Sequence, residues 1–126
     1  MVDKDNTPRI LLVDDERTQA QSIRNMLKRL GYQVAVRTDA EQALAAFRKD
    51  PDRFNLVITD QIMPKLTGVQ LATRLLELRP GLPVILCTGF SELVDSEGAH
   101  ALGIRGFLMK PFSMREMASA IKKALS

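Results

Sequence analysis

Residues 10–16 read Ile10-Leu11-Leu12-Val13-Asp14-Asp15-Glu16, so an apolar run leads directly into three carboxylates. A second apolar run, Phe54 to Ile58, ends one residue before another acid, Asp60. If both runs are parallel strands of one sheet, their carboxyl ends lie side by side and the acids converge. Two such charges about 4 Å apart repel by roughly 4 kcal/mol at an effective dielectric near 20. We therefore expect the gathered acids either to have raised pKa values or to bind a cation.

Short apolar runs typical of strands alternate along the whole chain with helical patterns. The runs are Ile10–Val13, Val34–Val36, Leu56–Ile58, Val84–Cys87 and Phe107–Met109. Between them, apolar residues recur with helical spacing, as they do from Ile23 to Leu30, and glycine or proline follows, as at Gly31 and Pro80-Gly81. Five strands alternating with five helices predict an α/β fold of the doubly wound kind, with a parallel sheet and helices on both faces.

Capping patterns predict where several helices begin. Thr38 with Glu41 has the spacing of a capping box, and Ser113 precedes the last helical stripe. The fourth helix is the weakest. Ser91 is a plausible N-cap, but Gly98 falls inside the pattern and costs about 1 kcal/mol relative to alanine. We expect low local stability for residues 90–103.

Length and composition predict one cytoplasmic domain. The 126 residues fit a single domain, 1–126, with an ordered core of about 9–125 and no output domain. No apolar run approaches the roughly 20 residues of a membrane helix, and the polar start of the chain is no signal peptide. Cys87 is the only cysteine, which excludes an internal disulfide and fits a reducing compartment.

The net charge of +3 raises the question of nucleic-acid binding. The basic residues are scattered, as at Lys28-Arg29, Arg48-Lys49 and Lys122-Lys123, each near a predicted helix end. Cations complement the helix macrodipole there. No aromatic side chains alternate with these charges to stack on bases. We therefore expect no direct nucleic-acid partner.

The chemistry lies where the strands end, since ligands of open α/β sheets bind at the carboxyl ends of the strands. In order, the strands are followed by Asp14-Asp15, by nothing reactive, by Asp60, by Thr88-Gly89 and by Lys110-Pro111. Mg²⁺ prefers one or two carboxylates, which Asp15 and Asp60 can supply. The Thr88 hydroxyl and the Lys110 ammonium suit the oxygens of a phosphoryl group.

This set of residues resembles the response-regulator receiver domain of the CheY-like superfamily, the phospho-acceptor module of two-component signalling. The matching residues are Asp14-Asp15, Asp60 with Met63-Pro64 and Gly68, Thr88-Gly89, and Lys110-Pro111-Phe112. They occur in the family's order at close to its spacing, and the resemblance covers residues 9–125. It implies a flavodoxin-like (βα)5 fold with a five-stranded parallel sheet in the order 2-1-3-4-5.

The resemblance also implies a Mg²⁺ cofactor and its ligands. Asp60 is the implied nucleophile, which becomes 4-aspartylphosphate and also binds the metal. Asp15 is the implied direct ligand, Asp14 the implied ligand through water, and the backbone carbonyl of Ile62 completes the set.

Three further roles follow from the same resemblance. Lys110 pairs with the acyl phosphate, and Thr88 donates its hydroxyl to it. Thr88 and Phe107 are the implied switch pair, in which the aromatic ring turns inward after the hydroxyl moves. The Lys110–Pro111 peptide bond is expected to be cis, although only about 5–6% of such bonds in folded proteins are.

The implied partners are a sensor histidine kinase or a phosphotransfer protein, which supplies the phosphoryl group from a phosphohistidine. A downstream effector or adjoining domain would read the fourth helix, fifth strand and fifth helix. Such a chain is a self-catalysed phospho-acceptor with slow autodephosphorylation and not a turnover enzyme. The alternative is a receiver of a hybrid histidine kinase or phosphorelay, which passes the group on to a phosphotransfer histidine.

Other classes fit less well. A flavodoxin-like cofactor binder needs a Ser/Thr/Gly loop after the first strand, where this chain has acids. A haloacid-dehalogenase-type phosphatase could use Asp14 and Glu16, but Asp60 is then unexplained. A phosphorylation-independent adaptor does not need the complete acid set. Structural roles suffice for Glu16 at a helix start, for His100 on an exposed helix and for Cys87 in the core.

Overall fold

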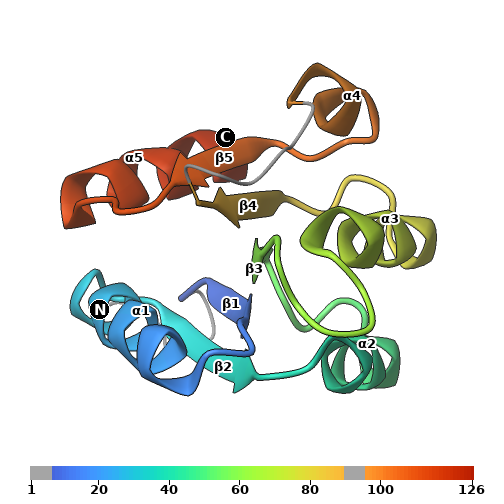
Figure 1. Cartoon of the computed structure of the whole chain (residues 1–126), viewed down its shortest axis with the longest axis horizontal. Coiled ribbons are helices and arrows are strands. Elements are labelled where there is room, and N and C mark those ends of the chain that lie inside the picture. Colours follow the sequence, from blue (N-terminus) through green and yellow to red (C-terminus); the bar gives the residue numbers. More distant parts are fainter. Residues whose placement is uncertain (1–6, 90–95) are drawn as a thin grey trace.

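The computed structural model describes residues 7–89 and 96–126, in which five strands alternate with five helices (Figure 1). The strands are β1 (Arg9–Val13), β2 (Gln33–Arg37), β3 (Leu56–Asp60), β4 (Val84–Thr88) and β5 (Gly106–Met109). The helices are α1 (Arg17–Arg29), α2 (Ala40–Lys49), α3 (Gly68–Leu78), α4 (Ser96–Ala101) and α5 (Met114–Leu125). None of these helices has the length and apolar character needed to cross a membrane.

The strands form one parallel sheet in the order β2-β1-β3-β4-β5, which confirms the predicted fold class and strand order. The register pairs Val13 of β1 with Thr59 of β3, and Asp60 with Cys87 of β4. The acids that follow β1 therefore lie next to the acid that ends β3.

Helices cover both faces of the sheet (Figure 1), with α1 and α5 on one face and α2, α3 and α4 on the other. Side chains along a strand point alternately to the two faces. Leu11 and Val13 accordingly pack towards α2 and α3, whereas Ile10 and Leu12 pack towards α1 and α5. This explains why the central strands are uninterrupted apolar runs.

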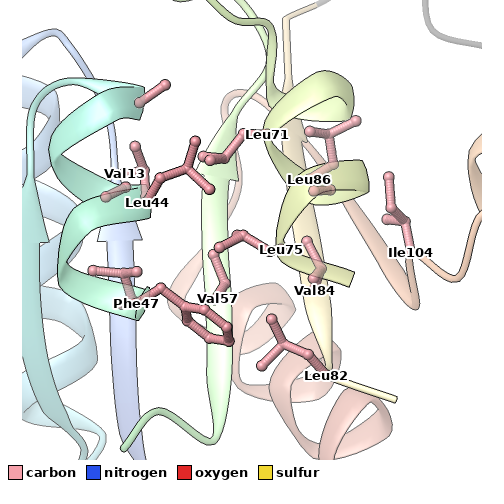
Figure 2. Close-up of a cluster of buried hydrophobic side chains, with 14 of the residues drawn as sticks. Val13, Leu44, Phe47, Val57, Leu71, Leu75, Leu82, Val84, Leu86 and Ile104 are labelled. Atoms are coloured by element: carbon pink, nitrogen blue, oxygen red, sulfur yellow. The ribbon is translucent and has the colours of Figure 1, made fainter. Parts of the chain in front are cut away.

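The larger core cluster lies between the sheet and helices α2 and α3. Figure 2 shows Phe47 of α2 and Leu75 of α3 reaching across the strands towards Val57. All three are fully buried, and the Phe47 ring stacks on Phe54 with their centroids 6.4 Å apart. Complete burial of such a side chain contributes about 1.5–3 kcal/mol. The central strands are thus held from both sides, which fixes the positions of their carboxyl ends.

Two predicted helix boundaries are confirmed. Gly31 follows α1 with φ of 98°, the left-handed conformation expected of a glycine stop. Ser113 caps α5 and forms a reciprocal capping box with Glu116.

The capping box predicted at Thr38 and Glu41 is wrong. Asp39 is the N-cap of α2, and its carboxylate accepts hydrogen bonds from the backbone N–H groups of Glu41, at 2.7 Å, and Gln42, at 3.1 Å. A carboxylate is a strong N-cap acceptor and complements the positive helix start, so the helix begins one residue later than predicted. The N-cap predicted at Ser91 lies outside the described residues.

Helix α3 starts directly against the end of β3, at Gly68. The Gly68 N–H donates to the carbonyl oxygen of Gln61 at 2.9 Å. A Cβ atom at position 68 would overlap the carbonyl oxygen of Asp60 and would lie 2.5 Å from the Leu86 side chain. The space beside the candidate nucleophile thus admits only glycine at this position.

Replacing Gly68 with alanine is predicted to lower the free energy of unfolding by about 1–3 kcal/mol, because backbone atoms of β3 must move to admit the methyl group. Gly106→Ala is the matched control, since the nearest atoms to its Cβ would belong to the Ile85 side chain, with Cγ1 at 3.2 Å. Urea unfolding monitored by circular dichroism measures both. Equal losses for the two variants would contradict the prediction.

Candidate functional site

Three carboxylates converge at the carboxyl ends of β1 and β3. Asp14, Asp15 and Asp60 each present an oxygen within 4.8 Å of the others. Asp14 is 1% exposed and Asp60 is 7% exposed, whereas Asp15 faces solvent. The convergence predicted from the sequence is therefore present, with two buried acids and one at the surface.

Backbone hydrogen bonds fix the segment that carries Asp14. Its N–H donates to the carbonyl oxygen of Arg37 at the end of β2, at 3.1 Å. Its Oδ1 accepts from the N–H of Glu16 at 3.0 Å. Glu16 itself caps α1 by accepting from the N–H groups of Thr18 and Gln19. Glu16 thus has the structural role at a helix start that was expected of it.

Lys110 joins the cluster from the far side of β4. The Lys110–Pro111 peptide bond is cis, as expected from the sequence. The Lys110 N–H donates to the carbonyl oxygen of Thr88 at 2.8 Å, and its Nζ donates to Asp60 Oδ1 at 2.5 Å. The acid at the end of β3 is therefore paired with an ammonium from beyond β5. Thr88, the last residue of β4, is buried beside this connection.

The charges of the cluster do not balance without a cation. Three carboxylates lie against one ammonium, that of Lys110. Burial raises the pKa of Asp14 to about 6. The charges of Asp60 and Asp15 add to this increase, while the hydrogen bond from the Glu16 N–H and the Lys110 ammonium oppose it. Carboxylate oxygens at this spacing are the donors that a hard divalent cation prefers, so the residues fit Mg²⁺.

The loop between β3 and α3 is fixed by Gln61, a residue that the sequence analysis did not single out. Its N–H donates to the carbonyl oxygen of Cys87 at 3.1 Å, and its buried side chain accepts from the N–H of Val69 at 3.0 Å. The next residue, Ile62, is 58% exposed. The metal-binding role of the Ile62 carbonyl stays a prediction. The sequence signal that was available for Gln61 is its position, since it is a polar residue directly after the acid that ends a buried strand.

Phe107 of β5 lies away from the acids. Its half-buried ring packs against the core cluster that includes Leu86 and Ile104. With Glu97 and His100 of α4 it also lines a shallow surface groove of about 560 Å³. His100 is exposed and Cys87 is buried, as expected. The switch role of Phe107 stays a prediction.

Comparison with known proteins gives one family. The sequence profile described as "Response regulator receiver domain" matches residues 10–122. The chain is 31% identical over 117 residues to "Response regulator receiver protein CpdR" of Brucella abortus, covering 93% of this chain and 96% of that protein. It is 32% identical over 120 residues to "Probable transcriptional regulator ycf27" of Cyanophora paradoxa, covering 95% of this chain and 49% of that protein. It thus spans about half the length of several curated relatives that it matches.

Solved structures agree with this result. A response regulator receiver domain protein from Clostridium thermocellum superposes with a TM-score of 0.89 at 30% identity, and 94% of each chain is covered. A CheY-like receiver domain protein from Methanospirillum hungatei JF-1 superposes with a TM-score of 0.85 at 32% identity, covering 95% of this chain and 94% of that one.

The raised pKa of Asp14 predicts a stability that depends on pH in the absence of metal. The ordinary value of 3.8 applies to the unfolded chain and about 6 to the folded one, so the folded state holds this proton more tightly. The contribution of Asp14 to the free energy of unfolding therefore falls as pH rises from about 4 to 6. Asp14→Asn removes that cost and should stabilise the protein by about 1–2 kcal/mol at pH 8, allowing for screening by solvent.

Urea unfolding in excess chelator at pH 4 and pH 8 measures the difference. The gain of Asp14→Asn should vanish at pH 4, where the folded wild type carries a proton on Asp14. Asp52→Asn, in the exposed segment before β3, controls for the loss of one negative charge. A gain that is the same at both pH values would show that the charge of Asp14 is not its cause.

Proposed function

The chain belongs to the family of response regulator receiver domains, and we propose that it accepts a phosphoryl group on Asp60 in a reaction that requires Mg²⁺. One observation carries the proposal. Asp14, Asp15, Asp60 and Lys110 come from three separate segments of the chain and gather at one edge of the sheet. No packing role requires this much charge in one place.

The proposed metal site uses the side chains of Asp15 and Asp60 and the carbonyl oxygen of Ile62, with Asp14 acting through water. When bound there, Mg²⁺ neutralises charge on the phosphoryl oxygens. Asp14 and Asp60 are buried, so their oxygens are held in place before the metal arrives. Asp15 is exposed and leaves the cluster open to solvent and to a donor.

The proposed chemistry is transfer from a phosphohistidine of a sensor kinase or a phosphotransfer protein. An oxygen of Asp60 forms a bond to phosphorus as the phosphorus–nitrogen bond breaks and the imidazole leaves with the electron pair. A carboxylate and a phosphoryl group repel each other, so the ammonium of Lys110 beside Asp60 lowers the barrier by offsetting the developing charge. Thr88 would donate its hydroxyl to the product. The chain acts once on itself and is not a turnover enzyme.

The proposed output is a rearrangement at α4, β5 and α5, which a downstream effector or adjoining domain would read. Phosphorylation adds close to two negative charges at the carboxyl end of β3. Movement of the Thr88 hydroxyl towards them leaves space on the face of the sheet where Phe107 packs. Turning of that ring inward would then shift the population between two packings of β5 against α4.

Phosphorylation of Asp60 is tested by incubating the protein with Mg²⁺ and a small-molecule phosphodonor and then measuring its intact mass. We expect one added phosphoryl group on the wild type and on Asp52→Asn, and none on Asp60→Asn or in excess chelator. Asp52→Asn removes the same charge from an exposed segment and serves as the matched control. A label that persists in Asp60→Asn would assign the acceptor to another residue.

The proposed switch is tested with a non-hydrolysable phosphate mimic and amide NMR. Shifts should be larger over residues 90–112 than over residues 23–47, because the rearrangement runs from Thr88 to Phe107. Phe107→Ala should bind the mimic and lose the shifts in α5. Perturbation spread evenly over the chain would argue against this route.

A further inference from the structure

The loop that carries Ile62 contains an unusual backbone conformation at Lys65. Among residues 7–89 and 96–126, Lys65 is the one non-glycine residue with positive φ, at 73°. This left-handed conformation is unfavourable for most L-residues, and glycine or asparagine adopts it more readily. A lysine here therefore needs interactions that offset the cost.

The side chain of Lys65 supplies such interactions. Its Nζ lies 3.1 Å from Asp39 Oδ2 and 3.3 Å from Glu41 Oε2. The two carboxylates raise the pKa of Lys65, while the hydrogen bond from the Gln42 N–H and the Lys65 ammonium lower the pKa of Asp39. The two carboxylates share one ammonium, and these interactions offset part of the backbone cost.

These ion pairs join two loops that flank the acid cluster. Asp39 caps α2 and stands two residues after Arg37, whose carbonyl oxygen accepts from the N–H of Asp14 at 3.1 Å. Lys65 stands three residues after Ile62 in the other loop. The ion pairs therefore link the segment that positions Asp14 to the loop that contains Ile62.

Gln61 anchors the start of the Ile62 loop. Gln61 accepts from the N–H of Gly68 through its carbonyl oxygen and from the N–H of Val69 through its side chain. These buried contacts hold the start of the loop against α3. Between Gln61 and α3, Met63 and Leu66 pack against the core cluster that includes the buried face of α2. The Lys65 ion pairs are the polar contacts that tie this loop to α2.

We propose that Lys65 is a positioning residue for the magnesium site, whose ion pairs with Asp39 and Glu41 hold the Ile62 carbonyl within reach of the carboxylates. The proposal rests on the proposed function, because it concerns the affinity of that same site for Mg²⁺. Lys65 does not touch the metal and acts only through the loop.

A purely electrostatic effect and a positioning effect predict opposite changes in Mg²⁺ affinity when this lysine is lost. Removing a positive charge near a cation site, and leaving Asp39 and Glu41 unpaired, should strengthen Mg²⁺ binding if charge alone matters. Loss of the loop anchor should weaken it. The direction of the change therefore separates the two explanations.

The test is a Mg²⁺ titration by isothermal titration calorimetry, without a phosphodonor. Lys65→Asn removes the cation and keeps a residue that tolerates positive φ. We expect its dissociation constant for Mg²⁺ to rise about three- to tenfold, the range that two exposed ion pairs can supply. Lys65→Arg, which keeps a cation, should bind nearly as the wild type does. Lys49→Asn loses an exposed lysine at the end of α2 and should show no weakening.

A double-mutant cycle identifies the partner. Glu41→Gln should weaken Mg²⁺ binding, and combining it with Lys65→Asn should add little to the effect of Lys65→Asn alone. Unchanged or tighter binding by Lys65→Asn would overturn the positioning role and leave the proposed function intact. A wild type that binds no Mg²⁺ would overturn the proposed function, and the role of Lys65 with it.

Discussion

The fold gathers three acids at one edge of the sheet against their mutual repulsion. Asp14 and Asp60 are buried within a few ångströms of each other and of Asp15. Burying like charges costs free energy. A buried cluster of acids therefore persists only where the surrounding structure holds the side chains in place. The Lys110 ammonium offsets part of the charge, and the pKa of Asp14 is still raised, chiefly by burial and further by the charges of Asp60 and Asp15. Carboxylate oxygens at this spacing fit a hard divalent cation.

The remainder of the fold supplies the rigidity that keeps these charges together. β1, β3 and β4 are buried on both faces, between α1 and α5 on one side and α2 and α3 on the other (Figure 1). Hydrophobic packing on both faces fixes the strand ends, and short polar contacts then fix the loops beyond them. Gly68 lets α3 approach the backbone of Asp60, and Gln61 fastens the loop between them. Hydrophobic packing in the core thus offsets the destabilisation that the acid cluster causes.

The fold holds the buried acids more firmly than it holds Phe107. Asp14 and Asp60 are buried, and hydrogen bonds from the Glu16 N–H and the Lys110 ammonium hold their carboxylates in place. Phe107 lies on β5, the edge strand, with a surface groove on its α4 side. An edge strand has one neighbour in the sheet and fewer contacts to hold it. The proposed switch would use this margin of the sheet.

Patterns in the sequence were sufficient to predict the fold class and the acids that meet at the site. Strand and helix periodicity, with acids at two strand ends, was enough to predict the parallel sheet and the meeting of Asp14, Asp15 and Asp60, because parallel strands share one carboxyl edge. Contacts that depend on the exact position of a partner are seen only in the folded structure. These include the choice of Asp39 over Thr38 as N-cap, the anchoring by Gln61, and the reach of Lys65 to Asp39 and Glu41. The periodicity of the sequence shows which face of a helix or strand a residue occupies. Whether a hydrogen bond forms depends on differences of tenths of an ångström in atomic positions, and packing sets those positions.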